Sequence, residues 1–560
     1  MLIFAAICLA ACGKHSDRKV IVFGVDGMDP GFLERHWGEL PALDQLRREG
    51  TSSRLATTDP PQSPVAWSSF ITGLDPAEHG IFDFVHRDPA THEAFLSISR
   101  TTEPRFRLPL GPWEIPLRSG GVELLRRGRP FWEGLVAQGV PVSILHMPAN
   151  FPPSGAGEEL SGMGTPDLRG TQGTYTLIEH AGDVEISGPA NTLRRDHAAT
   201  SSRLRIDIDA EHPVARFQVG GETILLNEGE WSDWLPVEFP LIPYLASARG
   251  MIRIFAKQLH PGVQIYVSPV NLDPSDPALP ISHPAGLSKD FAKTVGRYPT
   301  VGIPQDTTAL RNGALTLPEF LAHTMEILNT ERRLLRAALD RYQGGLLFFY
   351  FSSVDQNSHI LWGKDEAKLL EYYQGVDAAI GDARRREPGA RVIVMSDHGF
   401  TTFDHAVNLN AWLRQEGLLA TNREGQIDWS RTRAWALGLN ALYVSDAGEV
   451  GEIRRRLLEL RDPESGRAVV TAVGVVHASA ANQTVAPSLT IGYAAGYRAS
   501  WSTGLGEVSD RIFESNTDAW IGDHCVDPAA VPGGLIVSKG PPVTAAGIKD
   551  LGTVIVQLFR

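Results

Sequence analysis

Carboxylate and histidine side chains recur in this sequence directly after apolar runs, in a pattern that could bind metal ions. They are Asp26 after the run 19–25, Asp355 and His359 after 345–351, and Asp397 and His398 after 391–395. Carboxylate oxygen and imidazole nitrogen are the ligands of catalytic zinc, which keeps one position open for water or substrate. Asp355 and His359 are four residues apart, so both face one side of a helical turn and can bind one ion.

A serine and a late histidine extend this set to the ligands of two ions. Ser63 precedes Pro64, which can occupy the first turn of a helix, and the free N–H groups of a helix N-terminus favour a phosphoryl group. The alternative is that Ser63 is only a helix cap. His524 is the candidate late ligand, with His405 as its rival. Two ions could clamp the attacking and leaving oxygens of a displacement at phosphorus.

The elements that must position these residues are buried strands. Short unbroken apolar runs are typical of parallel strands that are covered on both faces. The carboxyl ends of such strands share one edge of the sheet, where α/β proteins bind ligands. The spacing of apolar residues predicts helices over 30–50, 317–342, 369–386, 408–413 and 450–460, and a further strand over 533–538. The sequence therefore predicts an α/β fold with a mostly parallel central sheet.

The region 106–304 differs from the rest of the chain in composition and pattern, and it is predicted to be an insertion that covers the site. It is dense in proline, glycine and polar residues, and segments such as 214–219 and 222–226 alternate in the manner of β-strands. We expect the catalytic core to comprise 19–105 and 305–560. Trp231 and Trp234 are predicted to belong to a small core of the insertion.

The first residues predict export. Residues 1–11 are apolar but too short to span a bilayer. Leu9-Ala10-Ala11-Cys12 resembles a bacterial lipobox, which predicts a signal peptide over 1–12, lipidation of Cys12 and a polar tether over 13–18. The protein would then be an exported lipoprotein, anchored to the membrane on the periplasmic side of the cell envelope. The alternative is that this run is a buried first strand.

The net charge of the chain limits the kinds of molecule that it can be expected to bind. The chain has 560 residues and a net charge of -13, from 52 basic and 65 acidic residues. Nucleic-acid binding needs basic surface that neutralises phosphates, so no nucleic-acid binding is expected. A small phosphorylated substrate remains compatible with this charge, because divalent ions reverse the charge inside a site.

The order of the motifs resembles the alkaline phosphatase superfamily. Asp26, Ser63, Asp355-x-x-x-His359, Asp397-His398-Gly399 and His524 follow the order of its nucleotide pyrophosphatase/phosphodiesterase-like branch. The strings 63–70, 79–84 and 408–413 are similar to a bacterial group of predicted phosphohydrolases or phosphomutases. The resemblance covers about 19–105 and 306–560. It implies a three-layer α/β/α sandwich of the alkaline phosphatase type, with the β-rich insertion added.

The resemblance also implies a role for each residue. Asp355, His359 and His524 would hold one divalent ion; Asp26, Asp397 and His398 would hold the other, with Zn²⁺ favoured over Mn²⁺. Ser63 would bridge the two ions as the nucleophile, forming a phospho-enzyme that water hydrolyses. The substrate would be a small phosphorylated molecule such as a nucleotide, a sugar phosphate or a lipid headgroup. His79 is expected to be a structural loop residue.

Departures from the superfamily narrow the expected reaction. Trp67 occupies the position that arginine holds in the sulfatase motif, so a sulfatase is disfavoured. No arginine is placed like the phosphate clamp of alkaline phosphatases. This favours a phosphodiester or a bulky phosphorylated substrate over free monoesters, unless the insertion supplies that arginine. Two alternatives stay open: a phosphomutase or phosphotransferase on the same site, and a non-catalytic envelope lipoprotein that binds a ligand.

Overall fold

The centre of the fold is a twisted sheet to which the N-terminal strand contributes a middle position. The computed structural model describes residues 18–102, 104–118 and 120–560. Within these residues the sheet has the order β2 (Thr51–Leu55), β32 (Gly533–Val537), β23 (Arg391–Met395), β1 (Lys19–Val25), β22 (Gly345–Phe351), β9 (Val142–Met147), β10 (Glu158–Ser161) and β21 (Ser282–His283). From β23 to β10 every pairing is parallel; β32 and β21 run antiparallel to their neighbours β23 and β10.

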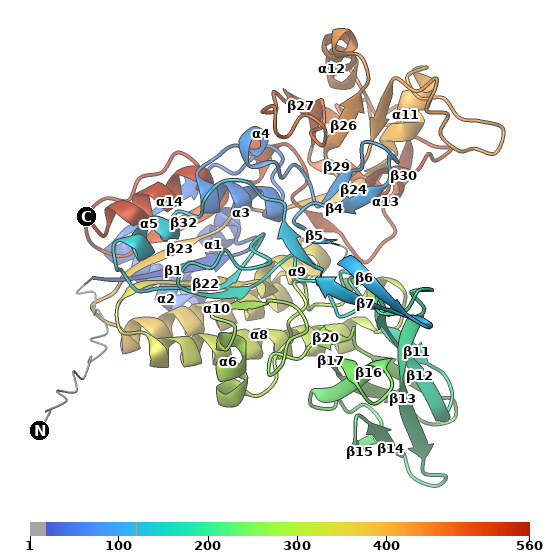
Figure 1. The fold of residues 1–560 in the computed structure, drawn as a ribbon. Coiled ribbons are helices and arrows are strands. Elements are labelled where there is room, and N and C mark those ends of the chain that lie inside the picture. The colour runs from blue at the N-terminus through green and yellow to red at the C-terminus, as the bar shows by residue number, and fades with distance from the viewer. Residues whose placement is uncertain (1–17, 103, 119) are drawn as a thin grey trace, which may run out of the picture.

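Helices cover both faces of this sheet, because its central strands are apolar on both sides. In β1, Ile21 and Phe23 pack into one core and Val20 and Val22 into the other. The first core contains α1 (Pro30–His36), α2 (Pro41–Glu49), α8 (Leu317–Arg341) and α10 (Glu366–Arg386); the second contains α3 (Ser63–Thr72), α5 (Trp132–Ala137) and α14 (Ile548–Gln557) (Figure 1). The predicted α/β/α sandwich with a mostly parallel sheet is confirmed.

The helix expected over 30–50 is divided into separate pieces. A turn of 3₁₀-helix, η1 (Trp37–Glu39), separates α1 from α2. Pro41 is the first residue of α2, and a proline there has no N–H to continue the preceding helix. The expected helices over 317–342 and 369–386 are present as α8 and α10.

The predicted β-rich structure of the insertion is confirmed, but part of that region belongs to the central sheet. Strands β9, β10 and β21 lie within 106–304 and extend the sheet beyond β22. Val142, Ile144 and Leu145 of β9 are buried, so this strand forms a further inner strand of the sandwich. The expected core boundaries at 105 and 305 therefore leave out three strands of the core sheet.

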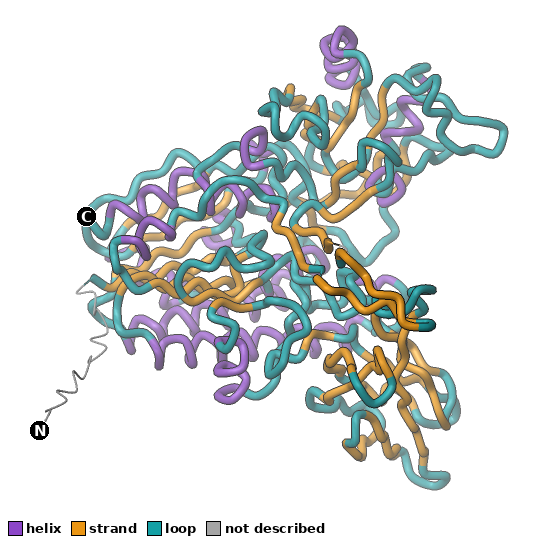
Figure 2. The backbone as a smooth tube through the Cα atoms, viewed as in Figure 1, coloured by secondary structure: helices purple, strands orange, loops and turns teal. Residues whose placement is uncertain are grey.

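The rest of the insertion forms small antiparallel sheets beside the sandwich, and Figure 2 shows this part as strands and loops. One sheet consists of β12 (Gly182–Ala190), β13 (Ala199–Ile208), β14 (Val214–Val219) and β15 (Glu222–Asn227). Two others consist of β16 (Leu235–Ile242), β17 (Ala246–Ile252) and β20 (Asn271–Leu272), and of β11 (Thr176–Ile178), β18 (Ile254–Gln258) and β19 (Gln264–Val267). The hairpin β6 (Arg105–Leu110) and β7 (Trp113–Arg118) lies outside them.

A second satellite follows β23 and has a hydrophobic core of its own. It contains β24 (Thr401–Val407), α11 (Leu409–Gln415), β25 (Ala434–Ala436), β26 (Ala441–Val444), η2 (Ala447–Glu449), α12 (Val450–Leu458), β27 (Val470–Val475), β28 (Leu489–Tyr493), β29 (Gly496–Ala499), α13 (Trp501–Gly504) and β30 (Phe513–Ser515). The chain leaves it through β31 (Gly522–Asp523), which pairs with β24 and leads back to the sheet edge.

Further short elements are β3 (Val85–Arg87), β4 (Ala94–Leu96), β5 (Ser99–Thr102), β8 (Gly121–Leu124), α4 (Pro76–His79), α6 (Leu287–Val295), α7 (Thr307–Arg311), α9 (Ser353–Leu361) and η3 (Pro528–Ala530). Among the described residues, no helix combines the length and the apolar content needed to cross a bilayer. The predicted signal peptide and Cys12 lie outside the described residues.

Candidate metal centre and active site

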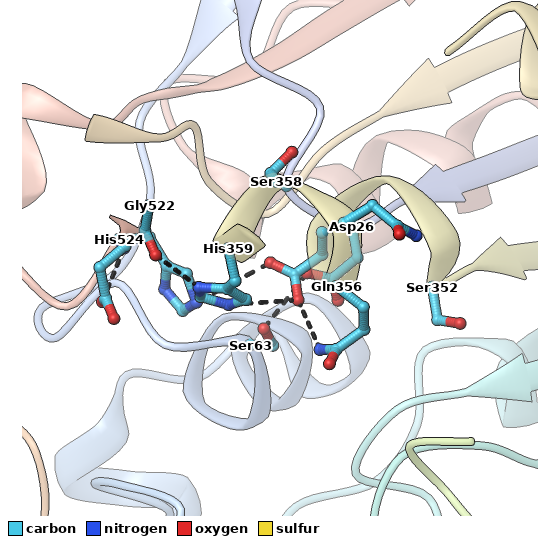
Figure 3. A network of polar contacts seen from close by, with 12 residues as sticks. Asp26, Ser63, Ser352, Gln356, Ser358, His359, Gly522 and His524 are labelled. Atoms are coloured by element: carbon cyan, nitrogen blue, oxygen red, sulfur yellow. Dashed lines mark hydrogen bonds and ion pairs between the residues drawn. The ribbon is translucent and has the colours of Figure 1, made fainter. Parts of the chain in front are cut away.

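The predicted ligands converge at the carboxyl edge of three adjacent strands. Asp26 follows β1, α9 with Asp355 and His359 follows β22, and Asp397 and His398 follow β23. Ser63 is the first residue of α3, and His524 follows β31. All seven side chains are buried. Figure 3 shows Ser63 and Asp26 beside His359, with His524 reaching in from the other side.

One group of ligand atoms consists of Asp355, His359 and His524. Candidate ligand atoms of these three residues lie within 4.8 Å of one another. His359 Nε2 is 3.6 Å from Asp355 Oδ2, and His524 Nε2 is 3.9 Å from Asp355 Oδ1. The i,i+4 spacing of Asp355 and His359 on α9 therefore points both side chains at one position, as the sequence indicates.

A second group consists of Asp26, Asp397 and His398, again with ligand atoms within 4.8 Å of one another. His398 Nε2 is 3.2 Å from Asp397 Oδ2 and 3.5 Å from Asp26 Oδ1. Ser63 Oγ lies 3.1 Å from His398 Nε2 and 3.3 Å from Asp26 Oδ1. The rings of His398 and His524 stack at 3.6 Å, so the two groups are direct neighbours.

The three histidines present the same nitrogen to the site. Nδ1 of His524 faces the Pro61 carbonyl at 2.7 Å, and Nδ1 of His359 faces the Gly522 carbonyl at 2.8 Å. Nδ1 of His398 faces the Gly399 carbonyl at 3.2 Å. A carbonyl only accepts, so Nδ1 carries the hydrogen and Nε2 holds a free lone pair. This is how metal-binding histidines are fixed by their neighbours.

Two buried carboxylate oxygens fit bound cations. Among the described residues, Asp355 Oδ1 and Asp397 Oδ2 have no hydrogen-bond partner. A buried, unpaired carboxylate oxygen is costly unless a cation or a donor compensates it. Each of these oxygens belongs to a different ligand group, so the donor set fits two ions.

The electrostatics of the site also favour cations. Burial, and then the neighbouring Asp355, raise the pKa of Asp26 to about 7. Burial raises the pKa of Asp355 to about 6, and burial together with Asp26 holds the pKa of Asp397 well above its usual range. Burial lowers the pKa of His359 to about 4, so its ring is neutral at pH 7. Three buried carboxylates repel one another, and divalent ions reverse this repulsion.

Two donors that the sequence did not single out hold Asp26. Tyr350 OH donates to Asp26 Oδ2 at 2.5 Å, and Trp67 Nε1 donates to the same oxygen at 3.0 Å. Oδ1 therefore remains for Ser63 and an ion. Trp67 lies four residues after Ser63 on α3, a spacing that could have placed both on one helix face. Tyr350 had no comparable signal within its uniformly apolar strand.

Asp523 lies beside the late histidine in a further group of candidate ligand atoms, with His524 and Cys525, and both of its oxygens already have protein partners. Its Oδ2 is paired with Arg498 Nε at 2.5 Å and accepts from Trp520 Nε1 at 3.0 Å. Its Oδ1 accepts from the backbone N–H groups of His524 and Cys525. Burial raises the Asp523 pKa, but Arg498 outweighs it, so the pKa is lowered and the carboxylate is ionised.

His405 and His79 lie outside the two ligand groups. His405 is bonded to Asp404 at 2.9 Å and lies outside both ligand groups, whereas His524 is inside one. His79 is buried in its loop, with Nε2 3.0 Å from Ser69 Oγ and Nδ1 accepting from Ile81 N. His79 therefore has the structural role that the sequence predicts.

Comparison with known proteins assigns the family. The family model of type I phosphodiesterase/nucleotide pyrophosphatase matches residues 20–206 and 254–491, which is well over half of the chain. The chain belongs to this family. It is accordingly an enzyme that acts on phosphoester bonds, and members of the family depend on metal ions. The nucleotide pyrophosphatase/phosphodiesterase branch predicted from the motif order is confirmed.

Two solved structures to which this family member is similar are distant from it in sequence. Phosphonoacetate hydrolase from Sinorhizobium meliloti 1021, in complex with phosphonoformate, is 13% identical with a TM-score of 0.47; the match covers 97% of this chain and 96% of that one. Murine ectonucleotide pyrophosphatase/phosphodiesterase 5 is 12% identical with a TM-score of 0.43, covering 97% and 95%. No curated protein sequence matches the chain.

A pocket of about 320 Å³ opens onto Ser63 and the first ligand group. Its walls are largely apolar and include Met163, Leu439, Trp501 and Leu505. The arginines that line this pocket in the described part of the chain, Arg311 and Arg498, both lie outside 106–304.

The two arginines of this family member's pocket both have carboxylate partners. Arg311 Nε pairs with Asp518 at 2.8 Å, and Arg498 pairs with Asp523. The guanidinium group of Arg311 lies 4.4 Å from the centre of the Trp501 ring, and that of Arg498 lies 4.0 Å from it. These two contacts hold the wall of the pocket in place. Both arginines are therefore held by the protein itself.

Proposed function

We propose that this enzyme hydrolyses phosphodiesters at a two-metal site with Ser63 as nucleophile. The observation that carries the proposal is the pair of buried ligand groups with Ser63 Oγ beside one of them and an unpartnered carboxylate oxygen in each. A hydroxyl alone is a weak nucleophile, and this setting can activate it.

The residues divide between two ions in the manner implied by the motif order. Asp355, His359 and His524 would hold one, and Asp26, Asp397 and His398 the other; each of these sets has its ligand atoms close together. Three imidazole nitrogens in six ligands favour Zn²⁺ over the harder Mn²⁺. When bound, the ions would lower the pKa of the Ser63 hydroxyl and neutralise the phosphoryl oxygens.

The chain's own residues then account for two displacements. Ser63 Oγ, held by Asp26 Oδ1, forms a bond to phosphorus while the bond to one ester oxygen breaks and that oxygen leaves as an alcohol. Water next attacks the phospho-serine, which releases the phosphomonoester and returns the proton to Ser63 Oγ. Tyr350 and Trp67 hold the other oxygen of Asp26, so this carboxylate keeps its orientation through both steps.

A diester is favoured over a free monoester by the pocket. A dianionic monoester calls for an additional cation, but Arg311 and Arg498 are already paired with carboxylates. The second ester group of a diester would instead contact Leu439, Trp501 and Leu505. Apolar surface of this kind stabilises a bulky or aromatic ester group by about 25 cal/mol per Å² buried.

The cellular location is proposed from the sequence alone. A lipidated Cys12 would place the enzyme on the periplasmic side of the envelope, where a nucleotide, a sugar phosphate or a lipid headgroup would be the phosphorylated substrate. Cys12→Ser should move the protein from the membrane fraction to the soluble fraction. An unchanged membrane fraction would contradict the lipid anchor.

The test of the proposed reaction compares bis(p-nitrophenyl) phosphate with p-nitrophenyl phosphate. The chain from residue 19, reconstituted with Zn²⁺ or Mn²⁺, should turn over the diester with the higher kcat/KM. A preference for the monoester would contradict the argument from the paired arginines. Two bound ions without turnover of either compound would contradict hydrolysis and favour transfer of the phosphoryl group to a second hydroxyl.

A further inference from the structure

A second cavity, of about 360 Å³, lies between the insertion and α8. Its walls come from the turn between β17 and β18, from the segment 295–304 and from one side of α8. It shares no lining residue with the pocket at Ser63. Its volume is within the range of small-molecule sites.

Arg253 places a partly buried cation without an ion-pair partner in this cavity. Its Nε donates to the Ser232 carbonyl at 2.9 Å, and its guanidinium lies 5.1 Å from the centre of the Trp231 ring. Among the described residues, Arg253 forms no ion pair and its terminal nitrogens donate no hydrogen bond, and Glu326 and Asp233 stabilise its charge only from a greater distance. Burial lowers the pKa of Arg253, which reflects the cost of holding this charge away from water.

The other arginines of the cavity already have partners. Arg297 Nε pairs with Asp273 at 3.0 Å, and Arg333 pairs with Glu326 at 3.0 Å. Asp233, the remaining carboxylate on the wall, is exposed to solvent and acts on the charge of Arg253 only from beyond ion-pair distance. Among the described residues, Arg253 is therefore the arginine of this cavity that has no directly paired carboxylate.

His323 adds an acceptor next to this cation. The side chain is buried, its Nε2 lies 3.2 Å from the Pro304 carbonyl, and its ring stacks on Trp231 with the centres 5.0 Å apart. The carbonyl only accepts, so Nε2 carries the hydrogen. Nδ1 is then an acceptor, and it has no hydrogen-bond partner among the described residues. A buried acceptor of this kind calls for a donor.

We propose that this cavity is a binding site for a small anion that also bears a hydroxyl group. The anionic group, a carboxylate or a phosphate monoester, binds the terminal nitrogens of Arg253, and the hydroxyl donates to His323 Nδ1. Trp231 holds both residues by stacking, so the two contacts are arranged before the ligand arrives. The site is separate from the catalytic pocket and does not depend on the reaction proposed above.

Calorimetric titration with matched probes tests both contacts. Glycerol 3-phosphate and glycerate carry the anion and the hydroxyls, whereas n-propyl phosphate and propionate carry the anion alone. Arg253→Gln should weaken a binding event for all probes by at least about tenfold, the worth of a hydrogen-bonded charge. His323→Phe keeps the ring stack and should remove the advantage of the hydroxylated probes, about fivefold, while the propyl probes bind as before.

Arg203→Gln is the matched control, because Arg203 is an exposed arginine of the same insertion that pairs with Asp183. It should leave every titration unchanged. Tighter binding of the two phosphate probes than of the two carboxylate probes would identify the anionic group as a phosphate, and the reverse order would identify it as a carboxylate. The proposal is overturned if the wild-type chain binds none of the probes at about 10 mM. It is equally overturned if a folded Arg253→Gln variant, checked by its circular dichroism, binds them as the wild type does.

Discussion

Tyr350→Phe offers a sharp test of how the metal centre is supported. The substitution removes one hydroxyl and keeps the ring in its buried place on β22, where the ring packs edge-on against Trp67 at 5.5 Å. The lost contact is the 2.5 Å hydrogen bond to Asp26 Oδ2. Hydrogen bonds to charged groups contribute about 1.5–3 kcal/mol, and the bond from Trp67 remains.

The expected result is weaker metal binding. Without Tyr350 OH, the Asp26 carboxylate is less well stabilised in its ionised form and freer to rotate away from Ser63. Loss of a residue that supports a ligand typically costs about 10–100-fold in metal affinity. Titration of the metal-free protein with Zn²⁺ against a chromophoric chelator should show this loss in one of two binding steps, and turnover should recover at high Zn²⁺.

Tyr266→Phe is the control for stability. Tyr266 is also buried and donates at 2.7 Å to a carboxylate, Asp306, but neither residue belongs to the metal centre. Both variants should lose a similar free energy of unfolding in the metal-free state, and only Tyr350→Phe should lose metal affinity. Equal metal affinities of Tyr350→Phe and the wild type would refute the supporting role of the Tyr350 hydroxyl.

Three further outcomes are expected. Ser63→Ala should retain two metal ions by elemental analysis while kcat falls by at least about 10³-fold; residual turnover near the wild-type level would mean that Ser63 is not the nucleophile. Leu505→Ser should raise KM for aryl diesters about fivefold without changing thermal stability, because this side chain lines the pocket yet is 66% exposed; an unchanged KM would place the ester group elsewhere. Burial raises the pKa of Glu331 from 4.5 to about 7, so the folded state binds the proton more tightly than the unfolded state does. The free energy of unfolding should therefore fall as the pH rises from about 4.5 to 7, by up to about 3 kcal/mol. Glu331→Gln should flatten this slope in urea unfolding at the two ends of that range, and a slope as steep as that of the wild type would assign it to other groups.

Glu331 also explains why α9 is well placed to carry two ligands. Its carboxylate accepts from Ser352 N and Oγ and from Ser353 Oγ, at the start of the helix that bears Asp355 and His359. This carboxylate therefore links α8 to the first turn of α9. It acts through the serines and does not touch the metal centre.

Much of the fold and of the site was predictable because it depends on local pattern. The strands β1, β22 and β23 are largely apolar runs, and a carboxylate follows the end of each within a few residues, so their common edge identifies Asp26, Asp355 and Asp397 together. The four-residue spacing of Asp355 and His359 predicts that they face one ion. These inferences need only the periodicity of strands and helices.

The rest depends on contacts between distant segments. Strand β9 is short and surrounded by proline-rich and glycine-rich chain, so its membership of the central sheet becomes visible only when Val142 pairs with Leu346. The pairing of Arg498 with Asp523, which holds the backbone of His524, likewise joins two loops. The carbonyl groups that fix the histidine rings come from residues such as Pro61 and Gly522, whose sequence gives no sign of this role.

The position of β1 in the sheet has a consequence for how the chain is made. This strand leaves the ribosome before both of its neighbours in the sheet, because its register partners are Gly345 to Phe351 on one side and Arg391 to Met395 on the other. The chain must therefore be synthesised as far as Met395 before both edges of β1 are paired. Until then it is an exposed strand of the kind that aggregates, and contacts of such large sequence separation form slowly. Refolding from denaturant should accordingly be slow and should yield more native enzyme at low protein concentration.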